Sequence, residues 1–127
     1  MVLLVEDDDS MRAAIERLLQ AADFDCMAYA SADALLAHGF GEASACLVSD
    51  LKLPGMSGLE LLSALREREI ALPFILITAH DSPGMREQAM SAGAAGYLPK
   101  PFRGTALLEV VRQAIKAAQD VHARPAR

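Results

Sequence analysis

At the centre of this chain lies the segment Leu47-Val48-Ser49-Asp50-Leu51-Lys52-Leu53-Pro54-Gly55-Met56-Ser57-Gly58. Its apolar start is typical of a buried strand, Pro54 and Gly55 mark a turn, and Ser57 opens a helical pattern. The strand therefore carries Asp50 to its carboxyl end. In an open parallel α/β sheet that end binds ligands, because helix N-termini and loop amides converge there. Taken alone, Asp50 also has a plainer explanation as a helix cap or a loop residue.

Length and composition predict one domain with a sizeable core. The chain has 127 residues, of which 53% are hydrophobic. The formal net charge of −5 leaves no broad basic surface, so we expect no direct binding to nucleic acid. No apolar run approaches membrane length, and the apolar start runs directly into the acidic residues 6–9. We therefore expect a soluble cytoplasmic domain with no membrane attachment.

The residues that commonly bind transition metals show no metal-site spacing. Cys26 and Cys46 lie in predicted strands without a CxxC or Cys/His pattern, which favours buried free thiols in a reducing cytosol. His38, His80 and His122 lack ligand spacing as well.

Strand and helix patterns alternate along the chain. The expected strands are apolar runs that suit parallel strands buried on both faces: residues 2–5, 24–29, 45–49, 73–77 and 96–98. The helical patterns are a helix capped by Asp8, Asp9 or Ser10, a short helix from Ser31 to Gly39, a third helix from Ser57, a fourth over about 83–91, and a last one carrying the apolar residues of 107–118. This alternation predicts a parallel sheet with right-handed crossovers and helices on both faces.

Two helices and the tail carry further expectations. On the third helix, Arg66, Glu67 and Arg68 are expected to face water, and the fourth helix has the thinnest apolar face. The end of the chain contains a proline and no periodicity, which is typical of a linker or a frayed terminus. We therefore expect a folded domain over 1–119 and a linker or tail over 120–127.

Three polar residues recur at strand ends. Asp50 and Thr78 are about one β-α-β step apart, and so are Thr78 and Lys100. All three therefore fall at the ends of successive strands, on the edge of the sheet that also receives the acidic run after the first strand.

These residues carry a resemblance that extends over nearly the full chain. It resembles the receiver domain of bacterial two-component response regulators, most closely those that precede a helix-turn-helix output domain. The matching pieces are Val5-Glu6-Asp7-Asp8, Ser49-Asp50 with Leu53-Pro54-Gly55-Met56-Ser57-Gly58, Ile77-Thr78-Ala79 and Tyr97-Leu98-Pro99-Lys100-Pro101-Phe102. The resemblance implies a doubly wound (βα)5 domain with a flavodoxin-like strand order of 2-1-3-4-5.

The resemblance also implies roles for the strand-end residues. Asp50 corresponds to the phosphoacceptor, while Asp7 would bind Mg²⁺ (or Mn²⁺) directly and Glu6 mainly through water. Asp50 and the backbone carbonyl of Lys52 would complete the protein's metal ligands. Such a cation offsets the repulsion between a phosphoryl group and clustered carboxylates. Lys100, aimed by a cis Lys100-Pro101 peptide, would bind a phosphoryl oxygen.

The resemblance further implies a switch and partners. The Thr78 hydroxyl would move toward the phosphoryl group, and Tyr97 would rotate into the space beside it, changing the face made by the fourth helix, the fifth strand and the fifth helix. That face would dimerise or dock a DNA-binding output domain absent from this chain. The donor would be a sensor histidine kinase or a histidine phosphotransfer protein, and the domain would catalyse only its own phosphorylation and dephosphorylation. Lys52 and His80 would tune the phosphoryl lifetime.

Alternatives exist for single residues and for the whole domain. Asp7 has a second explanation as a helix cap, Lys100 as a solvated lysine, and a slip of one residue would make Asp8 the ligand. A phosphatase of the haloacid-dehalogenase type needs a second Asp where this chain has Lys52. A nucleotide-binding module needs a glycine-rich motif that is absent. A degenerate receiver serving as a scaffold would lack some of the key residues.

Overall fold

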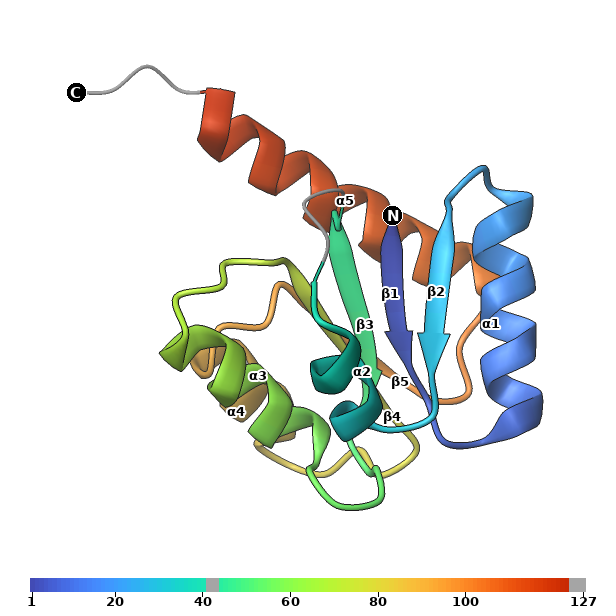
Figure 1. The fold of residues 1–127 in the computed structure, drawn as a ribbon, viewed down its shortest axis with the longest axis horizontal. Helices are drawn as coiled ribbons and strands as arrows, with labels where there is room; N and C mark the ends of the chain where they lie inside the picture. The colour runs from blue at the N-terminus through green and yellow to red at the C-terminus, as the bar shows by residue number, and fades with distance from the viewer. Residues whose placement is uncertain (41–43, 124–127) are drawn as a thin grey trace.

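The computed structural model describes residues 1–40 and 44–123, and a five-stranded parallel sheet lies at its centre (Figure 1). The elements are β1 (Val2–Val5), α1 (Asp9–Ala21), β2 (Cys26–Tyr29), α2 (Ala32–His38), β3 (Cys46–Asp50), α3 (Gly58–Glu67), β4 (Phe74–Thr78), α4 (Met85–Ser91), β5 (Gly96–Pro99) and α5 (Gly104–Ala123). The strands lie in the order β2-β1-β3-β4-β5. The predicted doubly wound (βα)5 fold is confirmed.

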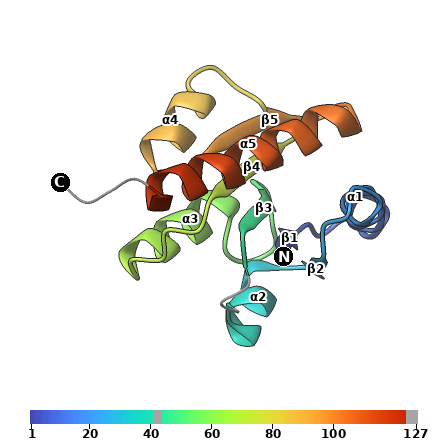
Figure 2. The same ribbon diagram turned by 90° about the horizontal axis from the view of Figure 1, so that it is seen from above.

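Helices cover both faces of the sheet and enclose two hydrophobic cores (Figure 2). Successive strand residues point to opposite faces, so Leu4 and Val48 pack beneath α1 and α5, while Leu3 and Leu47 pack beneath α2 and α3. The residues of β1, β3 and β4 are all buried, which explains why these strands are continuous apolar runs in the sequence.

The strand register brings the functional candidates to one edge. Val5 of β1 pairs with Ser49 of β3, so the residues after Val5 lie beside Asp50. Asp50 in turn pairs with Ile77, one residue before the end of β4, and Thr78 pairs with Pro99 of β5. Every strand points the same way, so these carboxyl ends form a single rim.

Local side-chain bonds mark the starts of α1 and α3. Of the three candidate caps for α1, Asp8 is the one that accepts a hydrogen bond from the backbone N of Met11. Ser57 and Glu60 form a reciprocal capping box at the start of α3. This box places the first turn of α3 directly after the loop that follows Asp50.

Predicted boundaries differ from the observed ones by one or two residues in every strand after β1 and at the start of α4. β2 begins at Cys26 instead of residue 24, because the backbone N of Phe24 still bonds Leu19 O at the end of α1. β3 and β4 both lie one residue later than predicted, so that β3 ends at Asp50 and β4 at Thr78, and β5 ends one residue later, at Pro99. α4 begins at Met85 instead of residue 83, since Gly84 adopts a left-handed φ of 84° that is incompatible with a helix.

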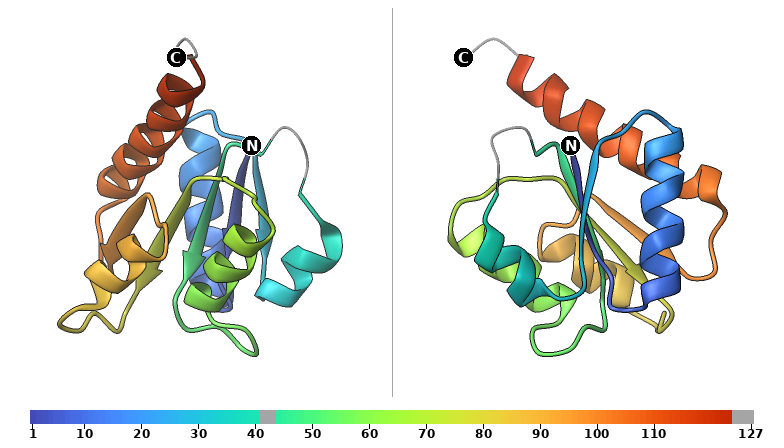
Figure 3. Two further views of the ribbon diagram at one scale, coloured as in Figure 1. Left: turned by 90° about the vertical axis from the view of Figure 1, so that its left-hand side faces the viewer. Right: turned by 45° about the vertical axis from the view of Figure 1, so that its right-hand side comes forward.

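The last helix is longer than the apolar pattern predicted. α5 extends to Ala123, through residues that the pattern assigned to a non-periodic tail; residues 124–127 lie outside the described part of the chain. Its C-terminal end projects beyond the sheet (Figure 3). Within the described ranges no helix, including the 20-residue α5, is apolar enough over sufficient length to cross a membrane.

Arg66 corrects the expectation that residues 66–68 all face water. Its guanidinium lies partly buried and donates to the carbonyls of Ile70 (2.6 Å), Leu72 (3.0 Å) and Gly93 (2.9 Å). Burial lowers the pKa of Arg66. The side chain ties the segment after α3 to the segment after α4, because its planar fork donates to backbone carbonyls in both.

Candidate functional site

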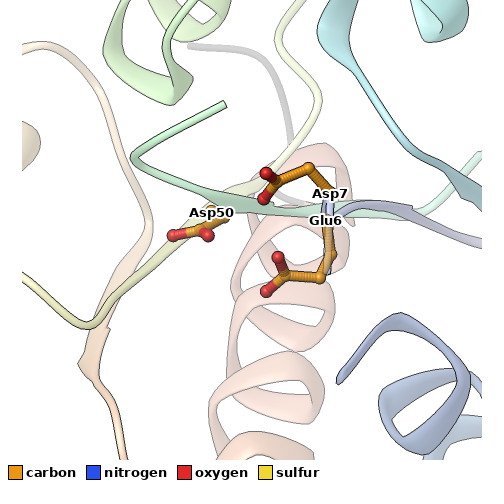
Figure 4. A group of neighbouring side chains, drawn as sticks. All are labelled: Glu6, Asp7 and Asp50. Carbon is orange, nitrogen blue, oxygen red and sulfur yellow. The ribbon is translucent and has the colours of Figure 1, made fainter. Parts of the chain in front are cut away.

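Three carboxylates meet where β1 and β3 end. Glu6 and Asp7 follow β1, Asp50 ends β3, and each offers one oxygen that lies within 4.8 Å of the others (Figure 4). Glu6 is fully buried and Asp50 is 8% exposed, whereas Asp7 is exposed. The site is therefore a cluster of two buried carboxylates and one exposed carboxylate, and it is accessible to solvent at Asp7.

Lys100 bridges two of these carboxylates. Its Nζ lies 2.6 Å from Glu6 Oε1 and 3.3 Å from Asp50 Oδ2, and its side chain is 12% exposed. The backbone holds the lysine there, since Lys100 N donates to Thr78 O at 2.6 Å and the Lys100–Pro101 peptide is cis, as expected. The ammonium thus lies beside the very carboxylate that the sequence proposes as acceptor.

Glu6 and Lys100 shift each other's pKa. Burial raises the pKa of Glu6, and the hydrogen bonds from Lys100 and from the backbone of Asp8 oppose that rise only in part. Burial alone would lower the pKa of Lys100, but the bond to Glu6 and the Asp50 charge outweigh it, so the pKa of Lys100 is raised. Lys100 is therefore held in its cationic form.

The donor set fits a hard divalent cation. Glu6, Asp7 and Asp50 supply only oxygen ligands, and Asp7 leaves room for water on the exposed side. Mg²⁺ prefers oxygen ligands from one or two carboxylates and keeps several waters. Such an acidic cluster could hold Mg²⁺, and Mn²⁺ accepts the same ligands.

Thr78 and Tyr97 are connected through the loop between β4 and α4. Thr78 is fully buried, and its Oγ1 accepts a hydrogen bond of 2.8 Å from the backbone N of His80. The next residue, Asp81, accepts a 2.6 Å bond from the hydroxyl of Tyr97, which is 3% exposed. Arg86 lies 5.1 Å from the centre of the Tyr97 ring. Burial, reinforced by Asp81, raises the pKa of Tyr97 to about 12.

Lys52 and His80, the two residues expected to influence lifetime, lie on the rim. Both side chains are exposed, Lys52 on the loop after β3 and His80 on the loop after β4. Each stands two residues beyond a strand-end residue, Asp50 and Thr78 respectively. Their exposure leaves both free to approach a group attached to Asp50.

Two further residues at this edge have no signal in the sequence. Asp81 contacts Tyr97 from the loop between β4 and α4, and Arg86 contacts it from the first turn of α4. Asp81 shares a loop with His80, and nothing in the spacing sets it apart from other loop acids. Such contacts depend on loop conformation, which periodicity does not report.

Comparison with protein families gives a match over most of the chain. The model described as "Response regulator receiver domain" matches residues 2–112. Nodulation protein W of Bradyrhizobium diazoefficiens is 39% identical over 111 residues, which are 87% of this chain and 49% of that protein. Transcriptional regulatory protein FixJ of Rhizobium meliloti is 36% identical over 113 residues, 89% of this chain and 55% of the relative.

Other relatives are matched over a smaller part of their length. The DNA-binding transcriptional regulator NtrC of Salmonella typhimurium is 36% identical over 120 residues, 94% of this chain but 26% of that protein. The chain thus spans between about a quarter and about half of these curated relatives.

Solved structures agree with the sequence relatives. The crystal structure of FixJ-N superimposes with a TM-score of 0.83 at 35% identity, covering 91% of this chain and 92% of that one. The response regulator StyR gives a TM-score of 0.87 at 40% identity over 97% of this chain and 63% of its own.

Proposed function

This chain belongs to the family of response regulator receiver domains, and on that premise we propose that Asp50 accepts a phosphoryl group in a Mg²⁺-dependent reaction. The observation that carries the proposal is the position of the Lys100 ammonium, 3.3 Å from Asp50 Oδ2, beside the carboxylates of Glu6 and Asp7. The domain acts as a signalling switch and has no substrate other than the phosphodonor. Its relatives are transcriptional regulators by name, so a transcriptional output is the proposed consequence.

The chemistry requires the chain mainly to position groups and to neutralise charge. An oxygen of the Asp50 carboxylate attacks phosphorus, and the bond from phosphorus to the donor's nitrogen or oxygen breaks as the new P–O bond forms. Lys100 shifts from Glu6 toward a phosphoryl oxygen as a point charge. Glu6, Asp7 and Asp50, with the Lys52 carbonyl, would hold Mg²⁺, which when bound neutralises the charge that the carboxylates and the phosphoryl group bring together.

The physiological donor in this proposal is a sensor histidine kinase or a histidine phosphotransfer protein in the cytoplasm. A small phosphodonor tests the acceptor without knowledge of the kinase. Acetyl phosphate with Mg²⁺ should add one phosphoryl group to the chain, and EDTA should prevent the addition. A chain that gains no phosphoryl group under these conditions would favour the scaffold alternative.

Lys52 is proposed to lengthen the phosphoryl lifetime. Its exposed ammonium stands two residues beyond Asp50, where it pairs with the phosphoryl group or shields it from the attacking water; His80 occupies the matching position after Thr78. An exposed ion pair contributes about 0.2–1 kcal/mol, so Lys52→Ala should shorten the half-life of the phosphoryl group by up to about fivefold. Decay of the phosphorylated chain after desalting measures this, with Lys116→Ala on α5 as the control. An unchanged or longer half-life in Lys52→Ala contradicts the role.

The proposed switch begins at Thr78 and reaches the face made by α4, β5 and α5. When the Thr78 hydroxyl donates to a phosphoryl oxygen, the backbone N of His80 that it binds is drawn with it. Asp81 follows His80 directly and holds the Tyr97 hydroxyl, so the displacement reaches β5. α4 is suited to move, because it has seven residues, no side-chain cap at its start, and only Ala89 fully buried. The altered face dimerises or binds an output domain.

Thr78→Ala should separate phosphorylation from its consequence. Phosphorylation at Asp50 should survive, but phosphorylation-dependent dimerisation should weaken by about tenfold, within the usual range of coupling between sites. Sedimentation velocity with and without acetyl phosphate measures it. Ser63→Ala, which removes an exposed hydroxyl from α3, outside the face made by α4, β5 and α5, serves as the control. If Thr78→Ala and Tyr97→Ala both dimerise as the wild type does on phosphorylation, the coupling follows another route.

A further inference from the structure

Arg12 of α1 reaches back to the turn that carries the acidic pair. Its Nη1 donates to the backbone carbonyl of Glu6 at 3.0 Å, and its Nη2 lies 2.7 Å from Asp9 Oδ1. The side chain is 24% exposed, so the guanidinium is held partly within the structure. Asp9 binds Nη2 of the guanidinium, and Nη1 points at Glu6 O.

The carbonyl that Arg12 binds belongs to the peptide joining Glu6 to Asp7. A hydrogen bond to this oxygen sets the orientation of the peptide plane and therefore the direction in which Asp7 leaves the chain. Two other bonds shape the same turn: the backbone N of Asp8 donates to Glu6 Oε2 at 3.2 Å, and Asp8 Oδ1 accepts from the backbone N of Met11.

Asp7 depends on this turn more than the other two carboxylates do. Glu6 and Asp50 are buried and contact Lys100, so their side chains are held by packing and by an ion pair. Asp7 is exposed, and its carboxylate oxygen comes within 4.8 Å of the other two through the path of the backbone. Loosening the turn would displace the ligand that lies nearest to solvent.

From these contacts we infer that Arg12 is a positioning residue for the cation site: it fixes the Glu6–Asp7 peptide so that the Asp7 carboxylate faces Asp50. The inference rests on the proposed metal-dependent function and adds a residue outside the carboxylate cluster to it. Groups that orient metal ligands from outside commonly change metal affinity by about 10–100-fold when they are lost.

The positive charge of Arg12 and its hydrogen bond to Glu6 O predict opposite effects on Mg²⁺ affinity when Arg12 is lost. A cation near the site repels Mg²⁺, so removing its charge alone should tighten Mg²⁺ binding. Removing the bond to Glu6 O frees the peptide plane, so binding should weaken. The sign of the change therefore separates the two contributions.

The test measures Mg²⁺ binding by calorimetry on the whole chain, without a phosphodonor. Arg12→Ala should bind Mg²⁺ about tenfold more weakly than the wild type. Arg12→Lys keeps the charge and can make one of the two bonds, so its affinity should lie between them. Arg17→Ala, which removes an exposed arginine from the same helix, should bind as the wild type does. Circular dichroism melting of each variant shows whether it is folded at the measuring temperature.

A second readout uses phosphorylation by acetyl phosphate across a Mg²⁺ titration. In Arg12→Ala the Mg²⁺ concentration for half-maximal rate should rise about tenfold, while the rate at saturating Mg²⁺ stays near that of the wild type. Unchanged or tighter Mg²⁺ binding in Arg12→Ala overturns the inference, as does an equal loss in Arg17→Ala. If the wild type itself binds no Mg²⁺, the proposed metal-dependent function fails first and the role of Arg12 fails with it.

Discussion

Asp50→Asn is expected to abolish phosphorylation by acetyl phosphate. The amide lacks the anionic oxygen that attacks phosphorus, and it also removes one of the three carboxylates of the cation site. Asn has nearly the same shape as Asp, so the bond between Ile77 O and the backbone N of Leu51 and the packing beneath β3 should persist. Mass spectrometry of the intact chain should show the wild type gaining one phosphoryl group and the variant none.

Asp8→Asn is the matched control for that loss. Asn caps helices about as well as Asp, so α1 should keep its start while one carboxylate disappears from the same edge. Phosphorylation should continue in Asp8→Asn. If Asp50→Asn were phosphorylated normally and Asp8→Asn were not, the residues assigned as phosphoacceptor and metal ligands would be wrong.

Gly58→Ala is expected to cause the largest loss of stability. Gly58 opens α3, and a Cβ there would lie 2.3 Å from the carbonyl oxygen of Asp50 and 2.9 Å from Leu76 Cδ1. The backbone of β3 cannot yield without disturbing its pairing with β4, so the clash should cost about 3 kcal/mol or more. The melting temperature should fall, and phosphorylation of the folded fraction should slow because the acceptor is displaced.

Gly104→Ala is the control for Gly58→Ala, because its added Cβ would meet a flexible side chain and not the backbone. At Gly104 the nearest atom to an added Cβ is Leu18 Cδ1 at 3.0 Å, which can rotate away. This variant should therefore melt close to the wild type. Equal stability of Gly58→Ala and the wild type would show that the loop after Asp50 can yield, against the rigid support proposed for the acceptor.

The sequence was sufficient for the fold because the buried strands are apolar on both faces. Parallel strands between two helical layers leave an unbroken apolar run, which makes β1, β3 and β4 recognisable. The same regularity brings Asp50, Thr78 and Lys100 to one edge, since each lies about one β-α-β step from the next. The edge strand β2 is only half-buried, and its start was placed two residues too early.

The contacts that escaped prediction join side chains to backbone or loops. Arg66 binds three carbonyls in the segments that follow α3 and α4, and Arg12 binds the carbonyl of Glu6. Neither geometry follows from a helical pattern that shows only which face is apolar. The Asp81–Tyr97 bond depends on the path of the loop after β4. These are the contacts that set how the site is held and connected.

The most direct measurement of the central claim is the location of the phosphoryl group on the wild-type chain. The chain is incubated with acetyl phosphate and Mg²⁺, the acyl phosphate is reduced with borohydride, and the peptides are sequenced by mass spectrometry. A single modification at Asp50, absent when EDTA is added and labile to base before reduction, is the predicted result. A phosphoryl group on Asp7 or Ser49, or labelling that survives EDTA, would contradict the account.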